Sequence, residues 1–394
     1  MKLLVLLSRF PHPLDKGDRL RAFHLLRCLA ARGHEICLFC LSDEPVSAAN
    51  EAVVRPLCRG GLAWHRLRRP GVARQMAWAL ATGRPLQVGY FYDPAAQRLL
   101  DKVLGEFQPD HVYCQLIRMA EYLRSHAGSW PLTLDYMDAF SAGVARRAAS
   151  APAWQRPVLA LEARRLAAYE TEIYGWFQQH TVISAPDARL LAHVGPAPPT
   201  IVPNGIDLTY FQPRPAAPPT CELLFCGNMA YYPNVDAAGW LADEILPLVR
   251  AAHPGARLLI AGTTPAARVL ALAQRPGITV SGWLPDLRVA YAGARVFVAP
   301  MRLGSGLQNK LLEAMAMGRP CVTTSLANNA LGGASGRQLL VADSAAALAE
   351  AIGSLLSHEA AAARLAVAGR TFVAETYDWA AATSRLENLF KVGC

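Results

Sequence analysis

The residues best suited to chemistry lie in the stretch 301–318, MRLGSGLQNKLLEAMAMG. This stretch follows a short apolar run that ends at Pro300 and is typical of a buried strand, and it continues into apolar residues at helical spacing. Gly304 and Gly306 let the backbone bend between the two. A glycine bend that leads into a helix leaves backbone N–H groups and the positive helix end at one point, which suits a phosphate. Lys310, in the first helical turn, adds a formal positive charge.

Glu313 lies one turn after Lys310, on the same face of the predicted helix. An ionised carboxylate accepts two hydrogen bonds and fits a cis-diol such as the ribose of a nucleotide. The pattern therefore predicts a nucleoside diphosphate, held by Lys310 at its phosphates and by Glu313 at its ribose. The alternative is a glycine-rich turn and an amphipathic helix with solvated Lys and Glu, because short glycine motifs recur by chance.

The spacing G-x-G-x3-K-x2-E-A-M-A-x-G-x-P over residues 304–320 resembles the donor motif of family-4 glycosyltransferases. These are retaining enzymes of the GT-B fold that use nucleotide sugars. The string QNKLLEAMAMGRPCV is similar to bacterial sugar transferases associated with exopolysaccharide and exosortase systems. The family usually carries two glutamates spaced E-x7-E, and Ser305 stands at the first position here while Glu313 keeps the second. The resemblance thus implies altered contacts to the donor sugar and retained contacts to the nucleotide.

The resemblance also implies donor contacts after other predicted strands. Asn228 stands where the family often has an arginine, so Lys310 is the main cation expected at the diphosphate, with Arg302 as a second. By the same resemblance, the Trp283 side chain would line the pocket for the nucleotide base. The alternative is that it only packs against neighbouring residues. The donor-binding residues that we expect are Gly17, Gly227, Asn228, Trp283, Leu284, Arg302, Gly304, Ser305, Gly306, Leu307, Gln308, Lys310 and Glu313.

Short apolar runs alternate with helical segments along the chain, which indicates parallel α/β sheets. The chain of 394 residues is too long for one ordinary core and predicts two domains. The expected strands are 2–7, 35–41, 111–114, 131–135 and 180–183 in the first half, and 222–226, 257–261, 277–281, 296–299, 321–324 and 338–341 in the second.

An Asn-Gly turn at 204–205 and a proline-rich segment at 213–219 mark the domain boundary. With the resemblance, we expect a GT-B fold of two Rossmann-like domains facing across a cleft. The expected parts are an acceptor-side domain (1–203), a linker (204–219), a nucleotide-sugar-binding domain (220–376) and a terminal helix that packs back on the first domain (377–394).

The loop after the first strand, residues 8–19, opens onto a helix, and ligands in open α/β sheets bind beyond the carboxyl ends of strands. In the resembled family this loop faces the donor diphosphate and the acceptor, which implicates Gly17. Asp135 ends a later strand and Asp138 opens the next helix, so both can face the cleft, where Asp138 binds acceptor hydroxyls or accepts a proton. Helix capping is the alternative for Asp18 and Asp138. The acceptor-side candidates are Lys16, Asp18, Arg19 and Asp138, and the catalytic candidates are Lys310, Glu313 and Asp138.

Residues 55–92 interleave seven arginines with five aromatic residues. This mixture suits a membrane interface or a lipid-phosphate acceptor, and also single-stranded nucleic acid. The alternative is two short helices with solvated arginines and aromatic residues in the core.

Composition narrows the class of protein further. The net charge of +9 permits nucleic acid, an anionic membrane surface or phosphorylated substrates as partners. The sequence lacks an uncharged apolar stretch of about 18 residues or more, so we expect no membrane span. Nine cysteines scattered along the chain favour a reducing cytosol. We therefore expect a cytoplasmic protein, with peripheral contact to the inner face of the membrane through 55–92 as an option.

The function that we expect is transfer of a sugar, with retention, from a nucleoside-diphosphate sugar to an acceptor hydroxyl in polysaccharide or glycolipid synthesis. The acceptor would be a saccharide, a lipid-linked saccharide or a small molecule, and neither a metal nor a cofactor beyond the donor is expected. A GT-B-like nucleotide-sugar epimerase or phosphorylase is the first alternative. A basic nucleic-acid-binding protein is the second, although no RNA-binding signature is present and we expect no nucleic-acid partner. No GxGxxG follows the first strand, so a dinucleotide dehydrogenase is disfavoured.

Overall fold

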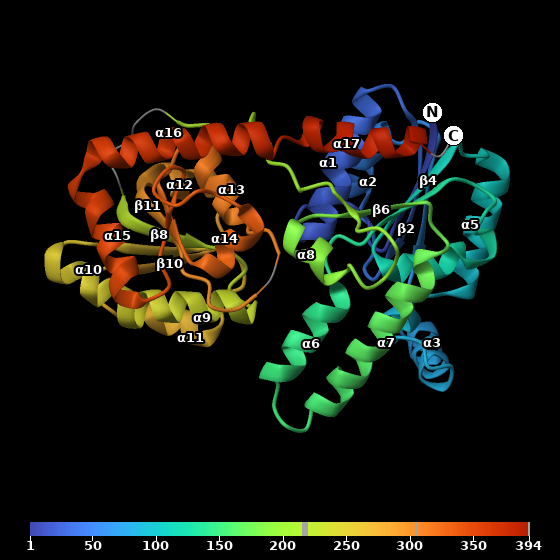
Figure 1. Ribbon diagram of the computed structural model, residues 1–394, viewed down its shortest axis with the longest axis horizontal. Helices are drawn as coiled ribbons and strands as arrows, with labels where there is room; N and C mark the ends of the chain where they lie inside the picture. The colour runs from blue at the N-terminus through green and yellow to red at the C-terminus, as the bar shows by residue number, and fades with distance from the viewer. Residues whose placement is uncertain (215–219, 305, 393–394) are drawn as a thin grey trace. The chain divides into compact units, whose positions relative to one another are not determined.

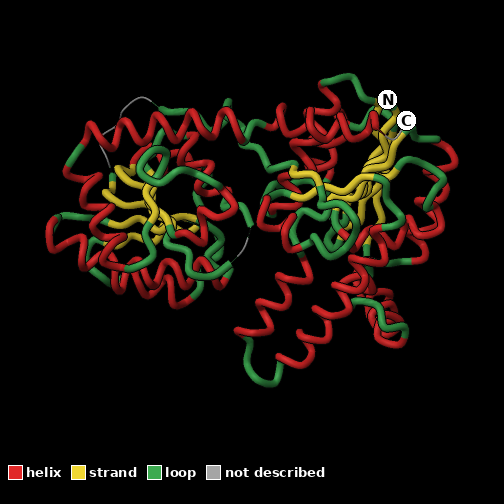
Figure 2. Tube along the Cα trace, viewed as in Figure 1, coloured by secondary structure: helices red, strands yellow, loops and turns green. Residues whose placement is uncertain are grey.

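The computed structural model of the chain describes residues 1–214, 220–304 and 306–392. The chain divides into two compact units, Met1–Asn204 with Trp379–Cys394, and Gly205–Asp378. Each unit contains one parallel sheet, and helices cover both faces of each sheet (Figures 1 and 2). The predicted pair of Rossmann-like domains is confirmed.

The first unit is built on a seven-stranded sheet in the order β3-β2-β1-β4-β5-β6-β7, with parallel pairing throughout. Its strands are β1 (Lys2–Leu7), β2 (Glu35–Ser42), β3 (Gly61–Arg66), β4 (His111–Gln115), β5 (Leu132–Asp135), β6 (Gln179–Val182) and β7 (Thr200–Ile201). Its helices are α1 (Gly17–Ala31), α2 (Ala48–Val54), η1 (Arg55–Leu57), α3 (Arg69–Ala81), α4 (Leu86–Phe91), α5 (Pro94–Phe107), η2 (Ile117–His126), α6 (Phe140–Ser150), α7 (Arg156–Tyr174), α8 (Ala185–Leu190) and α17 (Trp379–Val392).

Strand β1 shows why an uninterrupted apolar run folds this way. Successive side chains of a strand point to opposite faces of the sheet. Leu4 and Leu6 pack into one core cluster, whereas Leu3, Val5 and Leu7 pack into the other. A central parallel strand is covered on both faces, so the sequence KLLVLL buries nearly every side chain.

The second unit is built on a six-stranded parallel sheet in the order β10-β9-β8-β11-β12-β13. Its strands are β8 (Cys221–Cys226), β9 (Leu258–Ala261), β10 (Ile278–Gly282), β11 (Ala294–Ala299), β12 (Cys321–Thr323) and β13 (Leu340–Val341). Its helices are α9 (Tyr232–Trp240), η3 (Leu241–Ile245), α10 (Leu246–Ala252), α11 (Ala267–Leu272), α12 (Leu287–Gly293), α13 (Asn309–Ala316), α14 (Ser325–Leu331), α15 (Ala345–Ser357) and α16 (Glu359–Thr376).

Each sheet has one place where the strand order reverses: between β1 and β4 in the first unit, and between β8 and β11 in the second. Loops that follow the two strands at such a point diverge to opposite faces of the sheet and leave a crevice beyond the strand ends. Ligands of open α/β sheets bind there, so these two edges are where each unit is expected to hold a substrate.

The last helix, α17, belongs to the first unit. It packs against α1, and its residues Trp379, Leu386 and Phe390 join the core cluster on that face of the sheet. Arg32 at the end of α1 donates to Glu387 at 2.7 Å.

Strand β3 is an element that the sequence analysis did not anticipate. The interpretation of 55–92 as two short helices was incomplete: α3 and α4 form in this segment, but Gly61–Arg66 is a strand that pairs with β2 over its whole length. The strand lies at the edge of the sheet and its residues are only half-buried, so its sequence GLAWHR lacks the apolar run of a central strand.

A buried ion pair anchors α1 to the middle of the first sheet. The Arg21 Nε donates to Asp135 Oδ2 at 2.6 Å, and the hydroxyl of Tyr113 donates to the same oxygen at 2.5 Å. A second guanidinium nitrogen of Arg21 donates to Asn204 at 3.0 Å. The expectation that Asp135 faces a substrate was wrong, because its side chain is fully buried and its oxygens bind the protein itself.

We expect Arg21→Met to lower the free energy of unfolding by about 3–5 kcal/mol, because it leaves Asp135 as a buried charge without its cation. Urea unfolding followed by circular dichroism measures this loss. Arg55→Ala is the matched control, since it breaks an exposed pair with Glu51 and should cost about 0.3–0.5 kcal/mol. The double variant Arg21→Met/Asp135→Leu should recover part of the loss; equal losses in Arg21→Met and Arg55→Ala would contradict this account.

Candidate functional site

The predicted donor loop lies at the switch point of the second sheet. Gly227 and Asn228 follow β8, while residues 301–308 follow β11 and lead into α13. The backbone has a positive φ of 107° at Gly304 and 81° at Gly306, a conformation that favours glycine. Apart from its two chain neighbours, no atom of the described residues lies within 4 Å of where a side chain would begin at Gly306, so there is open space beside this glycine. Ser305 lies outside the described residues.

Lys310 is a largely buried cation whose hydrogen-bond partners are neutral. Its Nζ donates to Asn234 Oδ1 at 2.5 Å, lies 3.6 Å from Met301 Sδ and sits over the Phe225 ring at 5.1 Å. Burial lowers the pKa of Lys310 to about 8, although the nearby Cys226 and Glu313 oppose this shift. Within the described part of the chain no carboxylate comes within ion-pair distance of it. An anionic ligand would therefore supply a counterion for the Lys310 ammonium.

Glu313 lies beside Lys310 and is held by a tyrosine of α12. The hydroxyl of Tyr291 donates to Glu313 Oε2 at 2.7 Å and lies 2.9 Å from Cys226 Sγ. Burial raises the pKa of Glu313 to about 7, while the Tyr291 hydrogen bond and Lys310 favour the charged form. Tyr291 accounts for one oxygen of the carboxylate, and no hydrogen bond from a described residue occupies the other. The sequence analysis missed Tyr291, because it lies inside a helix 22 positions before Glu313.

Close backbone packing fixes the edge beside the donor loop. A Cβ on Gly262, which follows β9, would meet the carbonyl oxygen of Gly227 at 1.8 Å, so this position accepts only glycine. Asn234 donates to the Asn228 carbonyl at 2.9 Å, and this bond aims its own Oδ1 at Lys310. Asn234 thus orients the side chain of Lys310.

The other predicted donor residues take different positions. Arg302 forms a bidentate ion pair with Asp236 at 2.8 and 3.1 Å, so its charge is already balanced. Trp283, after β10, is 66% exposed, whereas Leu284 packs against the core. Gln308 is the N-cap residue of α13, but its side chain does not accept a hydrogen bond from the first N–H groups of this helix. Leu307 is half-buried against the core.

The switch-point edge of the first sheet carries a group of charged residues that we call the strand-end cluster: Arg9, Asp18, Asp43, Arg118 and Asp138. Arg9 donates to Asp18 Oδ2 at 2.5 Å, and Arg118 lies 3.6 Å from the same atom. Burial opposes ionisation of Asp18, but these two arginines outweigh it and lower its pKa. Burial beside Arg9 lowers the pKa of Arg118 to about 10. Both guanidinium groups also lie over the ring of Phe91, at 5.5 and 4.5 Å.

The side chain of Asp138 is accessible to solvent although protein atoms surround much of its carboxylate. Its side chain is exposed on one side, yet burial of the carboxylate raises its pKa to about 6. The charge of Asp187 adds to this rise, and Arg118 opposes it. A carboxylate that titrates near neutrality beside solvent is suited to accepting a proton.

The remaining acceptor-side candidates divide by burial. Lys16 and Gly17 are exposed at the start of α1, and Gly17 has space around its Cα. Arg19 is buried and its Nη1 donates to Asp15 at 2.9 Å. Asp18 does not cap α1 as the alternative suggested, because Lys16 is the N-cap residue.

Three members of the strand-end cluster escaped the sequence analysis as site residues. Arg9 follows β1, Asp43 follows β2, and Arg118 follows β4. The signal that would have found them is their position just beyond parallel strands that share one edge.

Comparison with protein families agrees with this geometry. Residues 20–210 match the model described as Glycosyltransferase Family 4, and residues 220–358 match the model described as Glycosyl transferases group 1. The chain therefore belongs to the GT-B glycosyltransferases, with a family-4 domain followed by a group 1 domain. The family that the 304–320 motif predicted is confirmed.

Similar proteins include both a sequence relative and solved structures. A protein from Klebsiella pneumoniae, "Uncharacterized 44.6 kDa protein in cps region", is 26% identical over 166 residues, which span 40% of this chain and 43% of that protein. Sucrose-phosphate synthase from Thermosynechococcus elongatus has a TM-score of 0.70 at 17% identity and covers 100% of this chain and 99% of its own. Anabaena Alr3699/HepE in complex with UDP has a TM-score of 0.69 at 12% identity, with both chains covered fully. At these identities the structures show the shared fold alone.

No helix among the described residues is both long and apolar enough to cross a lipid bilayer.

We expect the Lys310 ammonium to titrate near pH 8, because its burial penalises the charged form. The chain has five lysines, so reductive ¹³C-methylation and NMR titration resolve them individually. Besides the signal of the N-terminal amine, which ordinarily titrates at about 7.7–8.0, one methyl signal should show a midpoint near pH 8 and be missing in Lys310→Met. A Lys310 signal that titrates like an ordinary lysine, near pH ~10.4, would show that the side chain is solvated.

Proposed function

We propose that the chain transfers a sugar from a nucleoside-diphosphate sugar to an acceptor hydroxyl, with retention of configuration. The observation that carries this proposal is Lys310: a largely buried cation with neutral partners at the switch point of the second sheet, next to an open glycine bend. This arrangement has the charge and the space for a pyrophosphate. The carboxylate of Glu313, with one oxygen not engaged by a described residue, is suited to the ribose hydroxyls.

Transfer requires stabilisation of the departing nucleoside diphosphate. As the bond between the anomeric carbon and the phosphate oxygen breaks, negative charge grows on that oxygen. Lys310 and the N–H groups at the start of α13 would bind this charge more strongly as it develops, which lowers the barrier. No protein nucleophile is assigned, so the acceptor oxygen would attack the anomeric carbon on the face from which the diphosphate leaves.

The proposed acceptor site is the strand-end cluster of the first unit. Asp138 would accept the hydroxyl proton as the new glycosidic bond forms, since its carboxylate is accessible and its pKa lies near 6. Asp18 forms ion pairs with Arg9 and Arg118, which fix the positions of all three side chains. In this fixed geometry they would bind acceptor hydroxyls.

The neighbours support the choice of donor and pathway. Alr3699/HepE was solved with UDP and with UDP-glucose, so UDP-sugars are the first donors to test on this chain. The cps region of the Klebsiella relative fits the exopolysaccharide association that the sequence predicts. A panel of UDP-, GDP- and dTDP-sugars compared by thermal shift would identify the base, because a ligand that binds the native state raises Tm with its affinity. Incubation with donor alone separates the epimerase alternative, which needs no acceptor.

We expect Lys310→Met to raise the Tm of the ligand-free protein at pH 7 by about 2–4 °C and to abolish the Tm increase caused by UDP. The reason is that methionine fills the same space without a buried charge. The cost of that charge is fully present below pH 8 and is relieved as the pH rises from about 8 toward the ordinary lysine value, so the stability advantage should shrink over that range. Differential scanning fluorimetry between pH 7 and 10 measures both effects.

The control for this variant is Lys102→Met, at a lysine that is 68% exposed, which should change neither Tm nor the response to UDP. A Lys310→Met protein that keeps the full UDP response would remove Lys310 from the donor site.

We expect Asp138→Asn to lower kcat by about 10²–10⁴-fold while UDP binding stays unchanged, because the variant removes a proton acceptor and no nucleotide contact. In the unaltered enzyme kcat should be level above pH 6 and fall about tenfold per pH unit below it, since the ionised carboxylate is the base. Steady-state kinetics across pH 4.5 to 8 test this. Near-normal turnover in Asp138→Asn, or loss of the acidic limb without loss of activity, would assign the proton to another group.

A further inference from the structure

A recess beside the strand-end cluster is lined by arginines that no part of the proposed transfer uses. The arginine recess has a volume of about 880 Å³, within the range of roughly 300–1,000 Å³ for ligand pockets. It lies in the first unit, where β3 ends and α3 and α5 begin. Its walls are Trp64, His65, Arg66, Arg68, Pro70, Gly71, Arg74, Asp93, Pro94, Ala95 and Arg98.

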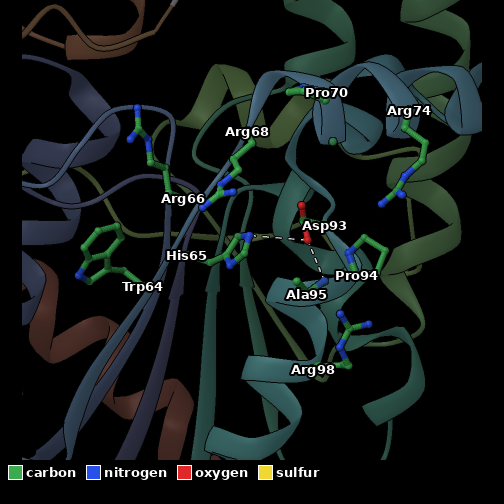
Figure 3. Close-up of a pocket in the computed structure, with 11 residues that line it drawn as sticks. Trp64, His65, Arg66, Arg68, Pro70, Arg74, Asp93, Pro94, Ala95 and Arg98 are labelled. Carbon is green, nitrogen blue, oxygen red and sulfur yellow. Dashed lines mark hydrogen bonds and ion pairs between the residues drawn. The ribbon is translucent and has the colours of Figure 1, made fainter.

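The arginines of this recess lack protein counterions. Arg66, Arg68, Arg74 and Arg98 are exposed, and none makes an ion pair with any residue that the structure describes. Figure 3 shows the head groups of Arg74 and Arg98 reaching from two helices toward Pro94. By contrast, Arg9, Arg84 and Arg124 in the same unit are all paired with carboxylates.

The single carboxylate among the described residues of the recess is already engaged. Asp93 Oδ1 accepts hydrogen bonds from the backbone of Ala95 and Ala96 and so caps α5, and it lies 3.6 Å from His65 Nε2 (Figure 3). The N-terminus of α3 also borders the recess at Pro70 and Gly71 and has no side-chain cap. Four guanidinium groups and an uncapped helix end against one occupied carboxylate leave a strong excess of positive charge.

The recess continues the edge that carries the strand-end cluster. Arg66 pairs in register with Ser42, the last residue of β2, and Asp43 of the cluster is the next residue in the chain. Phe91, which lies under Arg9 and Arg118, is two residues before Asp93. Asp138 follows β5, and β5 and β3 are four strand spacings apart, which is roughly 19 Å.

We infer that the arginine recess binds a phosphoryl group carried by the acceptor. Guanidinium groups bind phosphate oxygens in pairs and stay charged at every working pH, so a cluster of arginines without counterions suits a phosphate or pyrophosphate. This inference rests on the proposed function, because it takes Asp138 as the place of the reacting hydroxyl. The span from Asp138 to the recess then requires an acceptor longer than one hexose: an oligosaccharide with its reacting hydroxyl at one end and a phosphoryl group at the other.

The test titrates inorganic pyrophosphate into the full chain by calorimetry, in a Lys310→Met background that removes the proposed donor site. The expected result is binding that weakens with added salt and falls about tenfold or more in Arg74→Ala/Arg98→Ala. Arg59→Ala is the matched control, because it removes an exposed arginine that precedes β3, on the order of 17 Å from the other end of that strand. It should leave the affinity unchanged.

A second arm distinguishes the source of the phosphoryl group. Vesicles of phosphatidylcholine with one quarter phosphatidylglycerol are sedimented with the protein, with and without pyrophosphate. Retention that pyrophosphate and Arg74→Ala/Arg98→Ala both remove assigns the group to a lipid headgroup, and absence of retention alongside pyrophosphate binding assigns it to a saccharide phosphate.

Unchanged pyrophosphate affinity in Arg74→Ala/Arg98→Ala, or an equal loss in Arg59→Ala, would overturn the inference. Neither result depends on sugar transfer, so failure of the recess leaves the donor assignment standing. If the unaltered chain does not bind UDP, the proposed donor site is wrong, but the result for pyrophosphate binding is unaffected.

Discussion

The second unit buries most of one cation, Lys310, with which no described residue forms an ion pair. Helix α13 carries this ammonium over Phe225, with Asn234 and Met301 as its polar contacts. A buried charge with neutral partners is unfavourable for the fold alone, as the lowered pKa of Lys310 records. The proposal that an anion binds here draws on three surrounding features: the open space beside Gly306, the start of α13 without a side-chain cap from Gln308, and the Glu313 oxygen that no described residue engages.

The two units differ in whether a buried cation is paired with a carboxylate of the protein. In the first unit the deeply buried arginine is compensated by the protein, since Arg21 is matched by Asp135, and at the strand ends Arg9 is matched by Asp18. These pairs fix geometry without demanding a ligand. Four exposed arginines of that unit that pair with no described carboxylate line the arginine recess, where water screens them and the cost to the fold is small. From this difference in burial we expect the proposed donor site to bind tightly, and the proposed acceptor site to bind more weakly and in a salt-sensitive way.

Much of this arrangement was predictable from local sequence. The run KLLVLL identifies a central parallel strand, and the glycines, Lys310 and Glu313 of α13 are contiguous enough to be recognised as one loop and one helix face. Strand β3 was not predictable, because an edge strand with half-buried polar residues lacks the apolar signal. Contacts set by the tertiary fold were also out of reach: Tyr291 on Glu313, Asp236 on Arg302, and Arg21 on Asp135, which is 114 residues away in sequence. Asp135 and Asp138 occupy similar positions in the sequence. Only the packing of α1 shows that the Asp135 carboxylate is buried against Arg21, whereas that of Asp138 stays accessible.

Proton linkage tests the central claim most directly. If Lys310 lacks a counterion until the pyrophosphate arrives, its pKa must rise when UDP binds. At pH 8, where the free side chain is half protonated, calorimetry in buffers of different ionisation enthalpy should then show uptake of up to about half a proton per UDP bound. We expect this uptake in the unaltered chain and no heat of UDP binding in Lys310→Met. Binding of UDP with no proton uptake, or with the same uptake in both proteins, would contradict this expectation.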